Sequence, residues 1–190
     1  MPRLSELSVQ ELYRRSASIE PAPGGGSVTA LTGMLGVALV LKALRISLKR
    51  REDAAAFQPA DQALETIAAR LAEDADADAA SFAAFVAALR LPKATPDEAA
   101  ERAARLEAAA VASTEAGLDA LQHALEALDQ TKRLGPAIND QMAPDIDGGV
   151  RLLEVLRTNA IHNAEANLAS VKSVERRAEL SRRLEALKAR

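Results

Sequence analysis

One carboxylate stands on a helical stripe that is otherwise apolar. Asp78 follows Leu71 by seven residues and precedes Phe82 by four, and at about 100° per residue these separations return to nearly the same helix face. Asp74 lies one turn earlier and leans the same way, whereas Asp76 points elsewhere. A buried carboxylate is costly unless it is satisfied. Asp78 is therefore expected either to bond a neighbouring helix end or to act as a general acid–base group.

A second candidate is the segment PAPGGGS, residues 21–27, which leads into the most apolar stretch of the chain. Its prolines restrict φ, its glycines let another molecule approach the backbone, and Ser27 is a favoured N-cap residue. The pattern predicts a tight loop with free N–H groups at the positive end of a buried helix. Such an end suits an anion or a carbonyl oxygen.

Two asparagines and a basic run complete the polar candidates. Asn163 and Asn167 are i,i+4 neighbours on an apolar row, and buried amides need partners. They predict either a bridge between helices or recognition of the edge of a heterocycle. Lys49, Arg50 and Arg51 form the basic C-terminal end of the helix expected after the glycine loop. They indicate either a solvated helix end or a patch for an acidic ligand tail.

The elements that must position these groups are helices, because no segment shows a convincing strand pattern. Ser8 with Glu11, and Thr95 with Glu98, are capping-box signals at two helix starts. Helices are expected at about 8–18, 27–51, 59–90 and 95–132, and from 148 toward the C-terminus. Residues 133–145 are expected to be irregular, and 175–190 to form a charged helical tail. We predict an all-α, single-domain bundle (residues 1–190) of about five long up-down helices.

Composition narrows the function classes. The 190 residues include no cysteine and two histidines, which excludes a thiolate nucleophile and disfavours a metal centre. A net charge of −3 argues against a nucleic-acid partner. Residues 28–41 are apolar but shorter than the roughly 20 residues that span a bilayer, and the N-terminus is polar. We therefore expect a cytoplasmic protein without a membrane partner.

Three separated motifs occur in order along the chain. They are PAPGGGSVTALTGMLGVALV from residue 21, DAASFAAFVAALRLPKAT from Asp78, and the polar series Asn139, Asp145, Asn163 and Asn167. In type and spacing they resemble the hallmarks of the cyclodeaminase/cyclohydrolase family of folate one-carbon enzymes, over about residues 6–172. Arg102 stands at the position of an arginine that is characteristic of that family.

The resemblance implies a reaction and a site. It implies hydrolysis of the methenyl bridge of methenyltetrahydrofolate to formyltetrahydrofolate, or the related cyclodeamination of formiminotetrahydrofolate, in a homodimer. No metal or cofactor is implied, because the bridging carbon is already electrophilic. Asp78 would transfer the protons, Asn163 and Asn167 would bind the pterin edge, and Lys49 and Arg50 the glutamate carboxylates. The other implied substrate-binding residues are Pro23, Gly24, Gly25, Gly26, Ser27, Arg102, Asn139 and Asp145.

The chain departs from the family pattern after the glycine loop. Lys42 and Arg45 stand where relatives have an apolar residue and a small or polar one, and Ile138 replaces a glycine. These departures keep a second interpretation open. The chain would then be a divergent, non-catalytic helical paralogue that binds a folate-like or anionic ligand or a protein partner.

Overall fold

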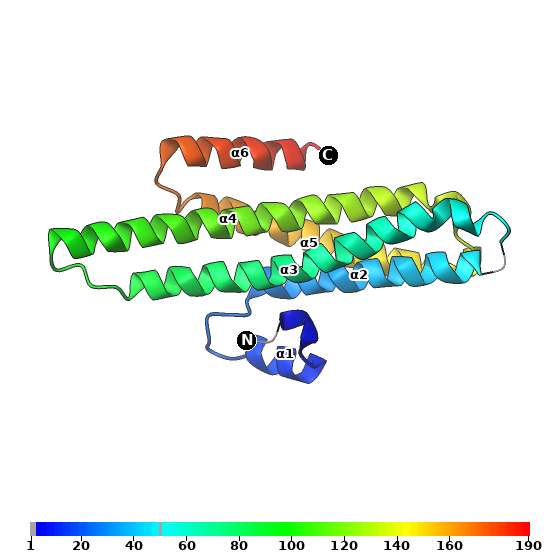
Figure 1. Cartoon of the computed structure of the whole chain (residues 1–190), viewed down its shortest axis with the longest axis horizontal. Coiled ribbons are helices and arrows are strands. Elements are labelled where there is room, and N and C mark those ends of the chain that lie inside the picture. Colours follow the sequence, from blue (N-terminus) through cyan, green and yellow to red (C-terminus); the bar gives the residue numbers. More distant parts are fainter. Residues whose placement is uncertain (1–2, 50) are drawn as a thin grey trace.

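The computed structural model describes residues 3–49 and 51–190, and over this part of the chain it contains helices and no strand (Figure 1). The α-helices are α1 (Val9–Ser16), α2 (Gly25–Leu48), α3 (Gln58–Leu89), α4 (Pro96–Arg133), α5 (Ala143–Leu168) and α6 (Val174–Lys188). Four 3₁₀ turns, Leu4–Glu6, Ala54–Phe57, Gly135–Ala137 and Asp140–Met142, lie between them. The predicted all-α class is confirmed.

Helices α2 to α5 form an up-down four-helix bundle (Figure 1). Each of them packs antiparallel against the next in sequence, and α5 closes the ring by packing on α2, while the diagonal pair α2 and α4 touches little. The core is built from leucine, valine and alanine in a chain with few aromatic residues. The small alanine side chains let the helices approach closely. Its fully buried side chains include Val37, Leu44, Leu64, Leu71, Leu118, Leu121 and Leu153.

Local signals account for most helix boundaries. The Thr95 hydroxyl accepts from the Glu98 N–H at 3.2 Å, and Glu98 Oε2 accepts from the Thr95 N–H at 3.0 Å, so the predicted capping box forms. Ser8 Oγ accepts from the Glu11 N–H and caps α1, but the Glu11 carboxylate accepts from Arg14 and Arg15 instead, so only half of that predicted box forms. The predicted N-cap at Ser27 is wrong. Gly24, in an extended conformation, is the N-cap of α2, and the Ser27 side chain, two residues inside the helix, is engaged elsewhere.

The last predicted helix is in fact two helices. The chain turns at residues 169–173, and α6 folds back along α4 and α5 (Figure 1). Leu180, Leu184 and Leu187 of α6 are buried, so the predicted charged helical tail packs against other helices of the same chain. The irregular segment is also shorter than predicted, because α5 begins at Ala143.

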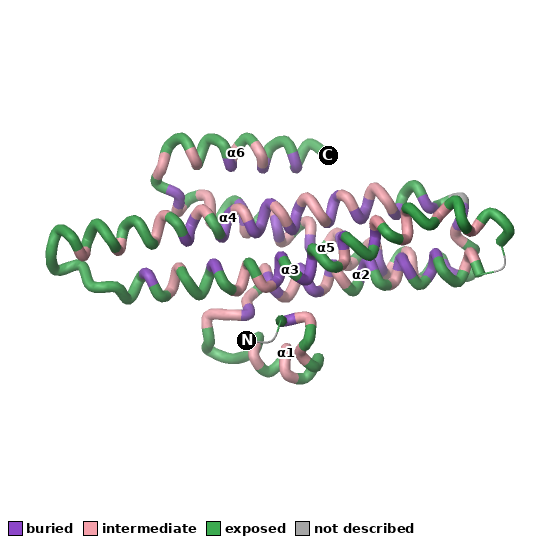
Figure 2. The backbone as a smooth tube through the Cα atoms, in the orientation of Figure 1, coloured by how far each residue is buried: buried purple, intermediate pink, exposed green. Residues whose placement is uncertain are grey.

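Helices α3 and α4 run past the ends of α2 and α5 and form a projecting two-helix arm, most of which is exposed (Figure 2). Phe82 and Leu89 on α3 are 44% and 46% exposed. The apolar stripe predicted along α3 is therefore covered up to about Asp78 and only partly covered beyond it, where Phe85 still packs against the core. Asp78 lies where α3 leaves the bundle.

Helix α2 is long and apolar enough to cross a membrane by length and composition, and 56% of its most apolar window is buried in the bundle. Its backbone approaches that of α5 closely. A Cβ atom on Gly36 would lie 2.8 Å from the carbonyl oxygen of Gly149, and one on Gly149 would lie 2.7 Å from that of Gly36. Both residues must be glycine for the two backbones to approach this closely.

Candidate active site

Asp78 lies against the first turn of α2. The Ser27 hydroxyl, which is fully buried, donates a hydrogen bond of 2.7 Å to Asp78 Oδ2. A Cβ atom on Gly26 would overlap the carboxylate, so glycine is required for this approach. Gly24 provides no side-chain cap for α2, and the carboxylate lies against the first turn of that helix, near the positive end of its dipole.

A small cavity lies beside this carboxylate, between four helices. It is lined by Gly26, Thr29 and Ala30 of α2, Asp74 and Asp78 of α3, Ala116, Gly117 and Ala120 of α4, and Leu156, Asn159, Ala160 and Asn163 of α5. Its volume of ≈ 10 Å³ is about what one water molecule needs. Polar groups therefore converge on a space that suits a single small reactant.

The α5 wall of the cavity carries a ladder of amides. Asn163 Nδ2 donates to Asn159 Oδ1 at 3.0 Å, and the Thr29 hydroxyl lies 3.0 Å from the same oxygen. Asn167 lies one turn further on and donates through Nδ2 to the Ser113 carbonyl at 3.2 Å. The two predicted asparagines therefore have different surroundings. Asn163 lines the cavity, whereas Asn167 bridges α5 to α4.

Sequence reasoning missed Asn159 and Thr29. Asn159 is the i−4 neighbour of Asn163, so extending the same spacing by one helical turn would have found it. Thr29 carried no comparable signal, because a threonine within an apolar helix commonly bonds its own backbone. The Thr29 hydroxyl does so as well, lying 2.8 Å from the Gly25 carbonyl oxygen.

Asp74 is more deeply buried than Asp78 and pairs with a histidine. Asp74 Oδ2 lies 2.6 Å from His123 Nδ1, and the two side chains are 10% and 15% exposed. Burial raises the pKa of the Asp74 carboxyl, an effect that the His123 partner only partly opposes. Burial acts to lower the pKa of His123, but the hydrogen bond and the charge of Asp74 outweigh it and raise that pKa. The pair therefore holds a proton more firmly than either group would alone in water.

Several predicted site residues lie at the opposite end of the bundle. Lys49 is the C-cap of α2, about 33 Å along the helix from Ser27 at 1.5 Å per residue. At that same end, the Asn139 N–H donates to Ser47 Oγ at 2.9 Å, and Asp145 forms an ion pair of 3.4 Å with Lys42. The structure does not bring these residues together with Asp78 within one chain. Arg50 lies outside the described residues.

The remaining predicted groups have partners within the fold. Arg102 Nη2 donates to the Leu89 carbonyl at 3.3 Å and so joins the two helices of the arm, while its Nε is buried without a partner among the described residues. Arg45 forms ion pairs with Asp61 and Glu65 on α3. Pro23 is buried in the loop, and the Ala22–Pro23 peptide bond is cis.

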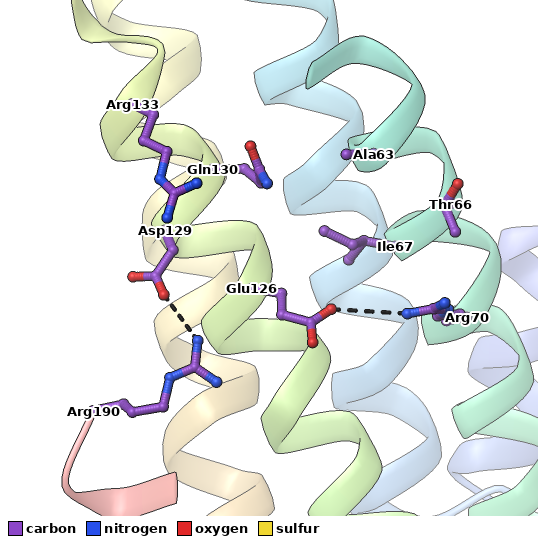
Figure 3. Close-up of a pocket in the computed structure, with 9 residues that line it drawn as sticks. All are labelled: Ala63, Thr66, Ile67, Arg70, Glu126, Asp129, Gln130, Arg133 and Arg190. Carbon is purple, nitrogen blue, oxygen red and sulfur yellow. Dashed lines mark hydrogen bonds and ion pairs between the residues drawn. The ribbon is translucent and has the colours of Figure 1, made fainter. Parts of the chain in front are cut away.

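A larger groove of ≈ 300 Å³ lies between α3 and α4 near the C-terminus (Figure 3). Figure 3 shows Arg70 facing Glu126 across it and Arg190 paired with Asp129, at 3.9 Å and 2.9 Å. Its charges are largely matched, and it lacks a carboxylate held at a helix N-terminus. The Asp78 cavity is the better candidate for chemistry. Among residues 3–49 and 51–190, no cluster of three or more acidic, histidine or cysteine side chains could hold a metal ion.

The fold and the site define a class of protein. A sequence model of the formiminotransferase-cyclodeaminase family matches residues 8–186, and the chain belongs to that family. The crystal structure of formiminotetrahydrofolate cyclodeaminase from Thermotoga maritima has the same fold, with a TM-score of 0.83 over 98% of this chain and 90% of that one, at 19% identity.

Two relatives have a higher sequence identity to this chain than that crystal structure has. Formimidoyltransferase-cyclodeaminase of Mus musculus is 34% identical over 111 residues, which are 55% of this chain and 20% of that protein. Methenyltetrahydrofolate cyclohydrolase of Methylorubrum extorquens is 31% identical over 120 residues, 60% of this chain and 56% of that one. The matched segment thus spans about a fifth of the mouse protein and just over half of the bacterial one.

Proposed function

We propose that this chain hydrolyses the methenyl bridge of methenyltetrahydrofolate to formyltetrahydrofolate, with cyclodeamination of formiminotetrahydrofolate as the related second candidate. The observation that carries the proposal is the Asp78 carboxylate, held by Ser27 at the N-terminus of α2 and lining one cavity with Asn159 and Asn163. Membership of the family supports the folate chemistry. The cyclohydrolase relative favours the first reaction, and the cyclodeaminase relatives favour the second.

The proposed hydrolysis balances without a further reactant. A water oxygen bonds to the cationic bridge carbon, one C–N bond breaks, one water proton goes to the leaving nitrogen, and the other proton is released. Asp78 would attract the amidinium charge, take a proton from the attacking water and return one to the leaving nitrogen. Positioned proton transfer of this kind contributes about 10²–10⁴-fold to a rate. The uncapped N–H groups of α2 would stabilise negative charge that develops on oxygen.

The size of the cavity indicates how the substrate would lie. A volume of ≈ 10 Å³ fits the attacking water and not a pterin. The ring system would therefore cover the mouth of the cavity, beside Gly25, which is exposed. From this position Asn163 and Asn159 would offer amide donors and acceptors to the ring edge.

A homodimer would complete the site. Leu35 and Val155 are 56% and 51% exposed, and each lies near the middle of its helix, α2 or α5, which pack side by side. A two-fold axis through this apolar patch, perpendicular to α2, would place the C-terminal end of α2 in one copy beside the N-terminal end in the other. Lys49 of a second copy would then approach the Asp78 cavity and could meet the glutamate tail.

The reaction is tested by following methenyltetrahydrofolate absorbance with wild type and Asp78→Asn, and by scoring ammonia release from formiminotetrahydrofolate. We expect Asp78→Asn to lower kcat by at least about 10²-fold. Asp76→Asn is the matched control, because Asp76 faces away and bonds the Leu4 N–H at 2.9 Å. Equal rates for wild type and Asp78→Asn would remove the assignment of Asp78. If the wild type shows no turnover and no thermal shift at saturating folate, the folate proposal itself fails.

The dimer is tested by complementation. Asp78→Asn and Lys49→Ala are each expected to be impaired, and a mixed dimer of the two would contain one intact site. Recovery of turnover on mixing supports the shared site. A monomer by light scattering, or no recovery from subunits shown to exchange, contradicts it.

A further inference from the structure

The buried Asp74–His123 pair has no part in the reaction described above. Asp74 lines the same cavity as Asp78 and lies one helical turn before it on α3. Two carboxylates at i,i+4 repel when both are ionised. Asp74 turns its Oδ2 toward His123 Nδ1, 2.6 Å away, on the side of α3 that faces α4. The pair thus connects the cavity to the α3–α4 interface.

His123 in turn lies near the larger groove. Arg70 and Glu126 are among the charged groups that act on its imidazole, and both line the groove of ≈ 300 Å³ (Figure 3). The groove is open and wide enough for solvent. One side of the pair therefore borders the cavity, and the other side lies close to groups that border the open groove.

Both candidate reactions move one proton between the cavity and solvent. Hydrolysis of the methenyl cation releases one proton overall. Cyclodeamination consumes one, because ammonia leaves with three hydrogens, whereas the formimino nitrogen and the attacking nitrogen together supply two. A cavity of ≈ 10 Å³ between packed helices offers little room for a chain of waters to carry that proton. A route through side chains is needed when the substrate covers the mouth.

We propose that Asp74 and His123 form a proton relay that connects the Asp78 cavity to the groove between α3 and α4. The inference rests on the proposed function. The proton leaving Asp78 would pass by way of water in the cavity to Asp74, and His123 would take it up at Nδ1 and release one at Nε2 toward the groove, or the reverse. Asp74 and His123 are positioning residues in this scheme, because they act on the substrate through Asp78.

The charged groups around Asp74 and His123 shift the pKa values of both side chains. Glu73 and Asp119 act on Asp74, and Glu126 and Arg70 act on His123. On α2 and α5 the cavity-lining groups are Thr29, Asn159 and Asn163, which do not ionise. Arg190, after α6, donates to Gln122 beside His123 and pairs with Asp129. Arg3 pairs with Glu73 and Arg183 with Asp119, so the groups that raise the pKa of His123 are chiefly Asp74 and Glu126.

His123→Gln tests the relay, because glutamine can still bond Asp74 but cannot carry a proton at neutral pH. We expect kcat to fall about 10²-fold, the lower end of what proton transfer contributes, with KM and the melting temperature little changed. The control is His162→Gln on the exposed face of α5. With wild type and the control, kcat should show an inflection at the pH where the His123 ring titrates by NMR. That inflection should be absent from His123→Gln.

Chemical rescue gives an independent readout. His123→Ala should recover turnover when imidazole is added, since a free ring can fill the space left by the deleted side chain, whereas His162→Ala should not respond to it. If wild type turns over and His123→Gln keeps its kcat and its pH profile, the relay is wrong and the proposed function stands. If wild type turns over neither substrate, the proposed function and the relay fall together.

Discussion

The Ser27 hydroxyl and the Asp78 carboxylate meet at 2.7 Å across 51 positions of sequence. Ser27 is fully buried in the first turn of α2, and Asp78 lies where α3 leaves the bundle. The hydrogen bond fixes one carboxylate oxygen, and the absence of a side chain at Gly26 gives the carboxylate its place against the backbone. The orientation of the proposed acid–base group thus depends on two small residues of the glycine loop.

Removing the serine hydroxyl should release the Asp78 carboxylate. We expect Ser27→Ala to lower kcat at least about tenfold, equivalent to ~1.4 kcal/mol of transition-state positioning. It should also lower the free energy of unfolding by about 1–3 kcal/mol, because the Asp78 carboxyl oxygen loses its hydrogen-bond partner. Turnover and urea unfolding measure the two effects. Ser81→Ala is the control, since Ser81 Oγ bonds the Asp78 backbone carbonyl at 3.0 Å and not its carboxylate. An equal kcat for the two variants would contradict this role of Ser27.

Filling the space at Gly26 should displace the same carboxylate. In Gly26→Ala the new Cβ atom would overlap Asp78, so we expect a loss of about 1–3 kcal/mol of unfolding free energy from overpacking, together with most of the turnover. For stability, Gly25→Ala is the matched comparison, because its Cβ atom would lie 3.9 Å from Asn159 Nδ2 in ordinary contact. Equal unfolding midpoints for the two variants would show that Asp78 moves aside without cost.

The buried histidine should make stability depend on pH. The pKa of His123 is raised above its ordinary 6.5, so above pH 6.5 the folded state holds more protons than the unfolded state, until the pH passes the folded pKa. The free energy of unfolding should therefore fall as the pH rises through this window, which begins near the ordinary histidine pKa of 6.5 and ends at the raised pKa of the folded state. Urea unfolding of wild type and His123→Gln at several pH values measures the difference. A wild-type curve that rises relative to that of His123→Gln would have the wrong sign.

The packing of α6 predicts a large effect from one leucine. Leu184 is 3% exposed, so Leu184→Ala should lower the free energy of unfolding by about 2–5 kcal/mol, the usual cost of such a cavity. Val174, at the start of α6, is 71% exposed, and Val174→Ala should change it by less than ~0.5 kcal/mol. Denaturant unfolding compares the two. A small effect of Leu184→Ala would mean that α6 does not dock on α4 and α5 in solution.

The all-α fold was predictable because its signals are local. Pro96, Glu98 and the Thr95 cap lie within four residues and set the start of α4 without tertiary help. The break between α5 and α6 was missed because no glycine or proline marks it. Ser173, which caps α6, was a weak signal. The break is held instead by Glu107 on α4, which accepts from the Lys172 and Ser173 N–H groups at 2.8 and 2.9 Å.

Parts of the candidate site were predictable where a residue type was unusual for its position in a helix. Asp78 on an apolar stripe and glycines at a helix start are such cases, and the structure places them together. The Asp74–His123 pair joins positions 49 residues apart, and nothing around His123 in the sequence indicates its partner. Lys49 and Asn139 show the opposite limit. The helix expected over 27–51 already places Lys49 about 33 Å from Ser27 at 1.5 Å per residue, whereas the position of Asn139 at that same end, bonded to Ser47, depends on the tertiary fold.

The contact between Gly36 and Gly149 sets the rotation of α2 about its own axis. Neither residue has a side chain that could adapt, and each backbone meets the other directly, so α2 cannot turn without separating from α5. Gly26 and Ser27 lie on the same rigid rod, about 15 Å away at 1.5 Å per residue. A methyl group added at Gly36 would push α2 away from α5. Because α2 is rigid, Gly26 and Ser27 would move as well, and these two residues position the Asp78 carboxylate on α3. Substitutions that abolish the proposed activity should therefore include positions, such as Gly36, that do not contact the substrate.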